Sequence, residues 1–237
     1  MKEAPTLKQI QEELHTLANK KIAQSSQRFF KTGPGQYGEG DFFLGIRVPT
    51  LHALSKQALS LNLEDLQALL DSKWHEERLI ALLILRRKYA KTPSQDFVDF
   101  YLKNTKKINN WDLVDTSAPY ILGAHLLAVK NSERALLYTL VESENLWERR
   151  IAILSTFTFI REHDFIDTFK LSERLLKDKH DLMHKAVGWM LREVGKKDEK
   201  ALKDFLDKHT KKMPRTALRY AIERFSKEDR SHYLNLK

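Results

Sequence analysis

The segment Arg78-Leu79-Ile80-Ala81-Leu82-Leu83 joins a basic residue to an unbroken apolar run. The same form returns in Arg150-Ile151-Ala152-Ile153-Leu154 and, with smaller residues, in Lys185-Ala186-Val187-Gly188-Trp189. Arg78 and Arg150 are 72 residues apart, which is two steps of 36, and Lys185 follows Arg150 after 35 residues. A repeat of this period is typical of stacked helix pairs, each of which buries its apolar face only against its neighbours. We therefore expect an α-solenoid (a superhelix) of HEAT-like units.

Apolar residues elsewhere recur at helical rather than alternating spacing, and the 237 residues include only eight glycines and six prolines. No segment has a convincing strand pattern, so the sequence predicts an all-α fold in a single domain over residues 1–237. Beyond two helices before residue 31, we expect helices at 50–60, 63–71, 76–90, 95–106, 118–129, 131–142, 146–162, 166–178, 182–196, 199–210 and 214–225.

The composition limits the classes of function that need to be considered. There is no cysteine, which excludes disulfides, thiol catalysis and zinc bound by cysteine. No apolar run approaches the ~18 residues of a membrane span, so we expect a cytoplasmic protein without a membrane partner. The formal net charge is +9, and residues 201–237 alone hold ten basic and five acidic residues. This bias favours a polyanionic partner, nucleic acid first.

The segment from Asn109 to Pro119 holds the first candidate site. If it begins as a helix, Trp111 and Asp115 are four residues apart, so an indole face and a carboxylate share one side. That pair can receive a planar cation. A core tryptophan followed by an aspartate near a helix end is the structural alternative, and it stays open. Thr116 to Pro119 should end this helix and offer a cap for the next.

The repeat suggests partners for Trp111 and Asp115. One step of 36 or 37 residues past Arg78 falls on Val114 or Asp115, and the next step falls on Arg150. Stacked units place equivalent residues on one concave wall, so Asp115, Arg150 and the turn around Trp189 could converge. Arg150 could bind a phosphate, and Gly188-Trp189 could add a second aromatic surface. A solvated charged turn and close helix packing at Gly188 are the respective alternatives.

The remaining patterns indicate no further chemistry. The segment Thr32–Gly40 contains half of the glycines but lacks the spacing of a nucleotide-binding loop, so we interpret it as a long structured connection. The nine histidines look incidental, because only His180 and His184 have the spacing of metal ligands and no third ligand accompanies them. We therefore expect no metal and no cofactor. No serine–histidine–aspartate set is visible.

Over residues 30–225 the sequence resembles the AlkD family of alkylpurine DNA glycosylases, the DNA alkylation repair enzymes. Four blocks carry the resemblance, and their order and spacing together make it specific: Phe43-Leu44-Gly45-Ile46-Arg47-Val48-Pro49, Trp111-Asp112-Leu113-Val114-Asp115, Asn145-Leu146-Trp147-Glu148-Arg149-Arg150-Ile151-Ala152-Ile153-Leu154 and Lys185-Ala186-Val187-Gly188-Trp189-Met190-Leu191-Arg192-Glu193.

The resemblance implies a HEAT-like solenoid with a basic concave face, which wraps duplex DNA as a monomer and removes N3- and N7-alkylated purines without a metal. It assigns the functional cleft to Trp111, Asp115, Arg150 and Trp189. Arg47, Lys185 and Arg192 are further candidates for contacts with the DNA backbone. Two features depart from a well-known member of the family: the segment Gly33–Gly40 is longer, and Asn110 stands where that member has an aromatic residue.

Two other classes of function remain open at this stage. A non-catalytic HEAT-like binder of damaged or branched DNA would bind duplexes in a salt-dependent manner without releasing bases. A protein-interaction scaffold would show no appreciable affinity for duplexes at physiological salt. The combination of Trp111, Asp115, Arg150 and Trp189 favours the glycosylase, because a scaffold has no use for it on one wall.

Overall fold

The structure is a computed structural model that describes residues 4–129 and 134–236. Within these ranges every regular element is helical, and extended backbone pairs only at one isolated parallel bridge between Phe42 and Trp74. The prediction of an all-α fold is confirmed. The stacking of the helices into a solenoid with a basic concave face stays a prediction.

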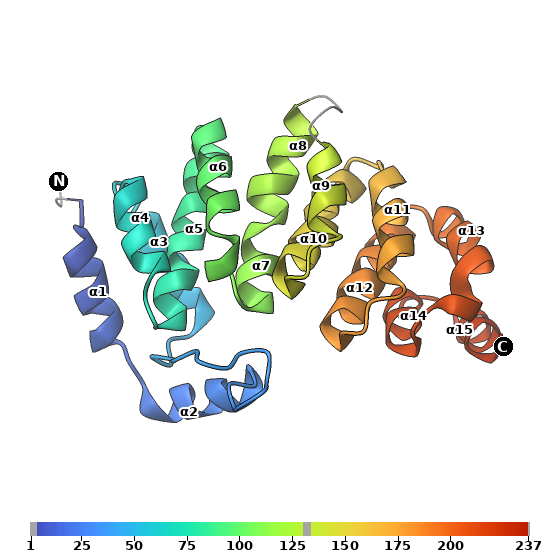
Figure 1. Cartoon of the computed structure of the whole chain (residues 1–237), viewed down its shortest axis with the longest axis horizontal. Helices are drawn as coiled ribbons and strands as arrows, with labels where there is room; N and C mark the ends of the chain where they lie inside the picture. The colour runs from blue at the N-terminus through green and yellow to red at the C-terminus, as the bar shows by residue number, and fades with distance from the viewer. Residues whose placement is uncertain (1–3, 130–133, 237) are drawn as a thin grey trace. The chain divides into compact units, whose positions relative to one another are not determined.

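The chain divides into two compact units, Met1–Ser117 and Ala118–Lys237 (Figure 1). The helices of the first unit are α1 (Leu7–Thr16), α2 (Lys20–Phe29), α3 (Val48–Gln57), α4 (Leu63–Leu70), α5 (His75–Lys91), α6 (Gln95–Lys103) and α7 (Trp111–Ser117). Those of the second unit are α8 (Ala124–Ala128), α9 (Ala135–Leu140), α10 (Leu146–Arg161), α11 (Ile166–Leu175), α12 (Asp181–Lys197), α13 (Glu199–His209), α14 (Arg215–Ala221) and α15 (Lys227–Asn235). That residues 1–237 form a single domain stays a prediction.

Helix α5 is the central helix of the first unit. All of its residues from His75 to Leu85 are buried, and α1, α3, α4 and α7 pack against it. A helix that is apolar on every side must lie inside the fold, which explains the unbroken run after Arg78. Its four polar residues at the start, His75 to Arg78, are buried as well, and buried charges need partners.

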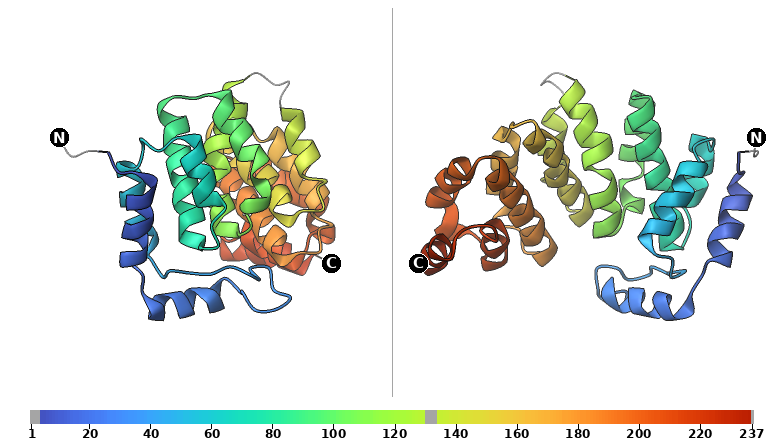
Figure 2. Two further views of the ribbon diagram at one scale, coloured as in Figure 1. Left: turned by 60° about the vertical axis from the view of Figure 1, so that its left-hand side comes forward. Right: turned by 180° about the vertical axis from the view of Figure 1, so that it is seen from behind.

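Helices α10 and α12 form the core of the second unit. The residues of α10 from Arg150 to Thr156 are all buried, and α9, α11 and α12 pack around it. Helix α12 packs in turn against α11, α13 and α14 (Figure 2). The apolar runs that begin at Arg150 and Lys185 therefore contribute buried residues to this core.

Helix α2 differs from the other helices because none of its residues is buried. It runs across the ends of α1 and α3 to α5, and the loop of residues 30–47 passes back beside it (Figure 1). Backbone hydrogen bonds hold this loop to the unit: Asn19 donates to the Leu44 carbonyl over 2.8 Å, and His75 donates to the Phe42 carbonyl over 2.8 Å. The expected structured connection around the glycine-rich segment is thus present.

Some predicted helix limits differ from the structure. Instead of one helix over 118–129, a π-helical turn at Pro119–Gly123 precedes the short α8, because Pro119 cannot donate the backbone hydrogen bond of a regular helix. Ser117 does not cap the next element, since its hydroxyl donates to the Leu113 carbonyl over 2.6 Å. The first residues of the predicted helix 131–142 lie outside the described residues, and α15 follows the last helix that was predicted.

Candidate functional site

Trp111 and Asp115 lie on α7, as the sequence predicted for a helix that starts near Asn109. The half-buried Trp111 indole stacks on the ring of Phe30, with a centroid distance of 5.2 Å and an interplanar angle of 21°. Phe29 meets the same indole edge-on at 5.8 Å. Phe29 is the last residue of α2, and Phe30 follows it directly. Their two ring contacts set the orientation of the Trp111 indole.

Asn110 holds the first turn of α7. Its side-chain oxygen accepts a hydrogen bond of 2.8 Å from the backbone N–H of Trp111, and its side-chain amide donates to Asp41 over 3.3 Å. Asn110 is fully buried, and an aromatic side chain there could not reproduce both bonds, because it lacks the adjacent acceptor and donor of the carboxamide. Asn110, which stands where one family member has an aromatic residue, therefore has a local structural role.

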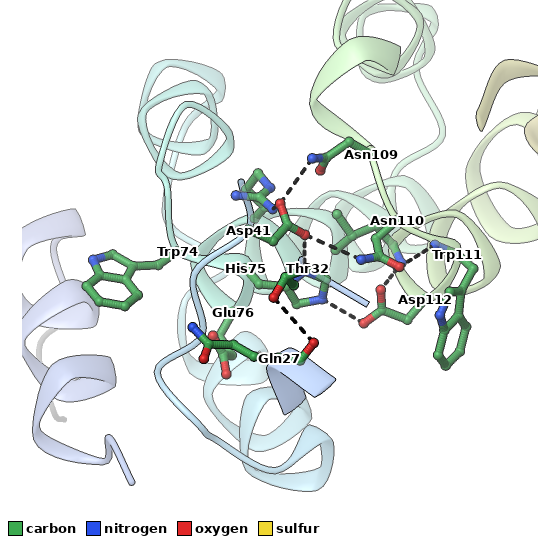
Figure 3. A network of polar contacts seen from close by, with 12 residues as sticks. Gln27, Thr32, Asp41, Trp74, His75, Glu76, Asn109, Asn110, Trp111 and Asp112 are labelled. Carbon is green, nitrogen blue, oxygen red and sulfur yellow. Dashed lines mark hydrogen bonds and ion pairs between the residues drawn. The ribbon is translucent and has the colours of Figure 1, made fainter. Parts of the chain in front are cut away.

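His75 joins Asp41 in the loop to Asp112 on α7 (Figure 3). Its Nδ1 lies 3.2 Å from Asp41 Oδ2 and its Nε2 lies 2.7 Å from Asp112 Oδ2. Burial alone would lower the pKa of His75, but the charge and hydrogen bonds of Asp112 and then Asp41 raise this pKa to about 9. The imidazole is therefore protonated at neutral pH and donates from both nitrogens.

Asp41 is the point where the loop, α5 and α7 meet. Besides the imidazole, its carboxylate accepts hydrogen bonds from Arg78 over 2.6 Å and from the Asn109 amide over 3.1 Å. Burial by itself would raise the pKa of Asp41, yet the hydrogen bond from His75 and the positive charge of Arg78 hold it below the ordinary value. Asp41 is thus a buried carboxylate that stays ionised and neutralised.

Glu76 anchors the part of the loop that carries the Phe43 to Pro49 block. Its buried carboxylate accepts hydrogen bonds from the backbone N–H groups of Leu44, Gly45 and Ile46 over 2.8, 2.8 and 3.2 Å. Gly45 has φ +85°, and a Cβ there would lie 2.2 Å from the Asn19 carbonyl, so only glycine fits. This anchor places the Phe43 ring on the His75 ring at a centroid distance of 4.5 Å.

Asp115 lies one turn after Trp111 and is half-buried. Burial raises the pKa of the Tyr101 hydroxyl on α6, and the negative charge of Asp115 adds to that rise. The Tyr101 hydroxyl itself lies 3.0 Å from the Ser117 hydroxyl. The charge of Asp115 thus acts on a buried hydroxyl of α6, whereas the Trp111 indole is held by the rings of Phe29 and Phe30.

Arg150 and Trp189 belong to the second unit. Arg150 is only 4% exposed, and its guanidinium donates a hydrogen bond of 2.7 Å to the Leu182 carbonyl in the first turn of α12. The half-buried Trp189 indole donates to Glu193 over 3.1 Å and lies beside Phe157 at 6.2 Å. Gly188 permits close packing, because a Cβ there would lie 2.4 Å from the Ala217 carbonyl on α14.

The three candidate DNA-contacting cations differ in their surroundings. Arg47 is exposed directly before α3, and among the described residues its side chain has no hydrogen bond or ion pair. Lys185 pairs with Asp181 over 2.7 Å on α12. Arg192 donates to Glu223 and lies 3.9 Å from Glu193. Arg47 therefore offers an unneutralised positive charge, whereas Lys185 and Arg192 would have to exchange a carboxylate for a phosphate.

The predicted residues fall into two sets. Trp111, Asp115 and Arg47 belong to the first unit, while Arg150 and the three residues of α12 (Lys185, Trp189 and Arg192) belong to the second. Each set is organised within its own unit by the contacts given above. The convergence of both sets on one concave wall stays a prediction.

Sequence reasoning missed the His75 network and Phe30. No spacing pattern singles out His75 among the nine histidines, although it opens a run of four polar residues directly before the apolar segment Leu79–Leu85. That run was the available signal, because charged residues at the start of a buried helix require buried partners. His180 and His184 instead bond to nearby backbone, at Leu182 N and Asp178 O. No group of three possible metal ligands occurs among the described residues.

The protein is all-helical in its described residues, and the residues around the first turn of α7 combine the stacked rings of Phe30 and Trp111 with the carboxylates of Asp41 and Asp112. A family model for the DNA alkylation repair enzyme matches residues 10–225, and the chain belongs to this family. No curated protein matches the chain. The chain is similar in fold to a solved structure described as a predicted DNA alkylation repair enzyme from Enterococcus faecalis, with a TM-score of 0.71 and 20% identity over 89% of this chain and 97% of that one. The described part of the chain contains no helix long and apolar enough to cross a bilayer.

Proposed function

We propose that this protein is a DNA glycosylase that hydrolyses the N-glycosidic bond of cationic alkylpurines, such as 3-methyladenine and 7-methylguanine, in duplex DNA. The observation that carries the proposal is the placement of Trp111 and Asp115 one turn apart on α7, with the indole fixed by Phe30. Membership of the DNA alkylation repair enzyme family supports DNA as the substrate.

The chemistry suits one carboxylate beside aromatic rings. Alkylation at N3 or N7 gives the purine a positive charge, which weakens the glycosidic bond and makes the neutral base a good leaving group. The enzyme then has to stabilise the oxocarbenium-like sugar and to position water. In the proposal, ionised Asp115 does both through its charge and as a general base, and the reaction requires no metal and no cofactor.

The aromatic and basic residues have complementary roles in the proposal. Trp111 and Trp189 contact the electron-poor sugar or the edge of the base, an attraction related to that between a cation and a ring face. Arg150 contacts a phosphate beside the lesion, and Arg47, Lys185 and Arg192 contact the DNA backbone further away. These roles require a monomeric solenoid whose basic concave face carries both sets of residues, which is part of the proposal.

The test is base release from methylated duplex DNA, followed by chromatography of the freed purines. We expect the wild-type protein to release 7-methylguanine or 3-methyladenine and Asp115→Asn to release neither, while duplex affinity changes little. The isosteric amide keeps the shape of the side chain and removes its charge. Full activity of Asp115→Asn would refute the mechanism. Duplex binding without base release by the wild type would identify a non-catalytic DNA binder instead.

A further inference from the structure

The helix α7, which carries Trp111 and Asp115, has only seven residues. A helix this short is marginal by itself, so contacts with its neighbours have to decide its position. Its first turn is held by Asn110 and by the bond between His75 and Asp112. Asp115 lies in the second turn, beyond these contacts. The contacts that hold the end of α7 therefore decide where this carboxylate lies.

The end of α7 is not held by a regular continuation of the helix. Pro119 follows four residues after Asp115 and has no N–H to donate to the Asp115 carbonyl. A π-helical turn over Pro119–Gly123 comes next, and α8 begins only at Ala124. The regular ladder of backbone hydrogen bonds is therefore interrupted within about one turn of Asp115.

Tyr101 of α6 makes a side-chain contact with this end. Its hydroxyl lies 3.0 Å from the Ser117 hydroxyl, and both residues are fully buried. Ser117 donates its single hydroxyl proton to the Leu113 carbonyl over 2.6 Å, so Tyr101 has to be the donor to Ser117. Burial raises the pKa of Tyr101, so its hydroxyl keeps this proton at neutral pH. The bond therefore has one direction and a defined geometry.

Helix α6 is itself anchored close to Tyr101. Three residues later, Asn104 exchanges two hydrogen bonds of 2.9 Å with Gln67 of α4. A second contact with the end of α7 comes from α5, where Arg86 donates to the Thr116 carbonyl over 3.2 Å. Side chains of the first unit thus attach the end of α7 to two neighbouring helices.

The bond from Tyr101 constrains the rotation of α7 about its own axis. The buried residues of this helix are Leu113, Val114 and Ser117. Asp115 is half-buried and lies elsewhere on the helix surface. Because both parts of the surface belong to one helix, a rotation that moved Ser117 would also move Asp115. A phenylalanine and an alanine would fill the same core, but apolar packing lacks the directionality of a hydrogen bond.

We infer that Tyr101, acting through Ser117, is a positioning residue that sets the place of the Asp115 carboxylate. The inference rests on the proposed function, in which Asp115 is the carboxylate that the glycosylase uses. Because Tyr101 is fully buried, it contacts no substrate and acts only through α7. If the hydroxyl pair served only to satisfy a buried tyrosine, its loss would lower stability and leave the rate unchanged.

The test compares the single-turnover rate of base release from methylated duplex DNA with the affinity for that duplex. Tyr101→Phe removes only the hydroxyl. We expect the rate constant to fall about ten-fold and the duplex Kd to stay unchanged, since a displaced general base slows the chemical step alone. Ser117→Ala should have the same effect. The double variant should lose no more than either single variant, because all three lack the same hydrogen bond.

A tyrosine of the second unit provides the matched control. Tyr233 is 4% exposed, and its hydroxyl donates to Asp207 over 2.9 Å. Tyr233→Phe also removes a tyrosine hydroxyl from a hydrogen bond and should lower the Tm, but it should leave the rate of base release unchanged.

A second measurement needs no DNA. The NMR signal of the Asp115 carboxyl carbon, assigned by its loss in Asp115→Asn, reports on the surroundings of this carboxylate directly. We expect this signal to shift in Tyr101→Phe and in Ser117→Ala, and to stay in place in Tyr233→Phe.

The inference is overturned if Tyr101→Phe releases bases at the rate of an active wild type, or if the Asp115 signal is the same in both proteins. Additive losses in the double variant overturn it as well, since they would mean two separate effects. A wild-type protein that releases no base refutes the proposed glycosylase. The Asp115 signal then decides alone whether Tyr101 positions the carboxylate.

Discussion

His75 Nε2 lies 2.7 Å from Asp112 Oδ2, so a side chain that opens α5 holds the residue directly after Trp111. The other ring nitrogen faces Asp41 in the loop, and the ring face is covered by Phe43. Phe43 stacks on Phe30, which stacks on Trp111. The orientation of the Trp111 indole therefore depends on one buried imidazolium through both a polar and an aromatic route.

Removing this imidazolium should destabilise the fold strongly. His75→Gln leaves Asp41 and Asp112 without their shared cation, and breaking a buried charge pair costs roughly 3–5 kcal/mol. We expect the free energy of unfolding to fall by about that amount, measured by urea denaturation at pH 6.5. His232→Gln, at an exposed histidine of α15, is the control and should change the free energy by less than about 0.5 kcal/mol.

The same network should make stability depend on pH in the alkaline range. The pKa of His75 is raised to about 9 in the folded protein, above the unfolded value of about 6.5. Its contribution is fully present below the unfolded pKa and is lost as the pH rises through the folded pKa. The loss between pH 6.5 and 9.5 is on the order of 3 kcal/mol. Thermal unfolding should show a falling Tm over this range, and a His75→Gln protein with the same slope would contradict the assignment.

Asp112→Asn should lower the pKa of His75 markedly from about 9, because Asp112 makes the largest favourable contribution to the charged imidazole. The measurement is an NMR titration of the His75 ring carbons. The control is Asp99→Asn, at an exposed aspartate on α6, which changes the net charge of the protein by the same amount. This variant should leave the pKa of His75 unchanged. Equal effects of the two variants would mean that the shift comes from net charge rather than from contact.

Glu76→Gln should loosen the loop that carries Phe43 and Arg47. A glutamine has one acceptor oxygen and places its NH₂ group against backbone N–H donors, so it cannot satisfy Leu44, Gly45 and Ile46 together. We expect a loss of about 2–3 kcal/mol and much faster hydrogen exchange at residues 44–46. Glu64→Gln, at the exposed first turn of α4, should leave exchange in the loop unchanged.

Gly188→Ala and Gly195→Ala form a matched pair on α12. A Cβ at position 188 would lie 2.4 Å from the Ala217 carbonyl, so helix α14 would have to move. At position 195 the nearest atom is the end of the Leu202 side chain at 2.5 Å, which can rotate away. We expect Gly188→Ala to cost about 2–3 kcal/mol by overpacking. Gly195→Ala should be nearly neutral, because alanine also favours the helix by about 1 kcal/mol, and similar losses in thermal unfolding would contradict this packing.

The sequence indicated the helical fold and its core helices because apolar periodicity is a local property. Apolar runs such as Arg78–Leu83 and Arg150–Leu154 predicted helices there, and the structure has α5 and α10 at these places with those runs buried. The sequence also placed Trp111 and Asp115 on one side of one helix, since side chains four residues apart are neighbours on a helix surface. Their catalytic use, and the convergence with Arg150 and Trp189, remain predictions.

The sequence by itself determined that the chain is helical, and its four sequence blocks identified the family to which it belongs. Only the tertiary structure decided that His75 is charged and central, and that Asn110, Asp41 and Glu76 fix the loop and the start of α7. The reason is that a side chain's charge and contacts depend on partners 30 or more residues away, as His75 and Asp112 show. Residue type and spacing do not specify which buried groups meet once the helices pack.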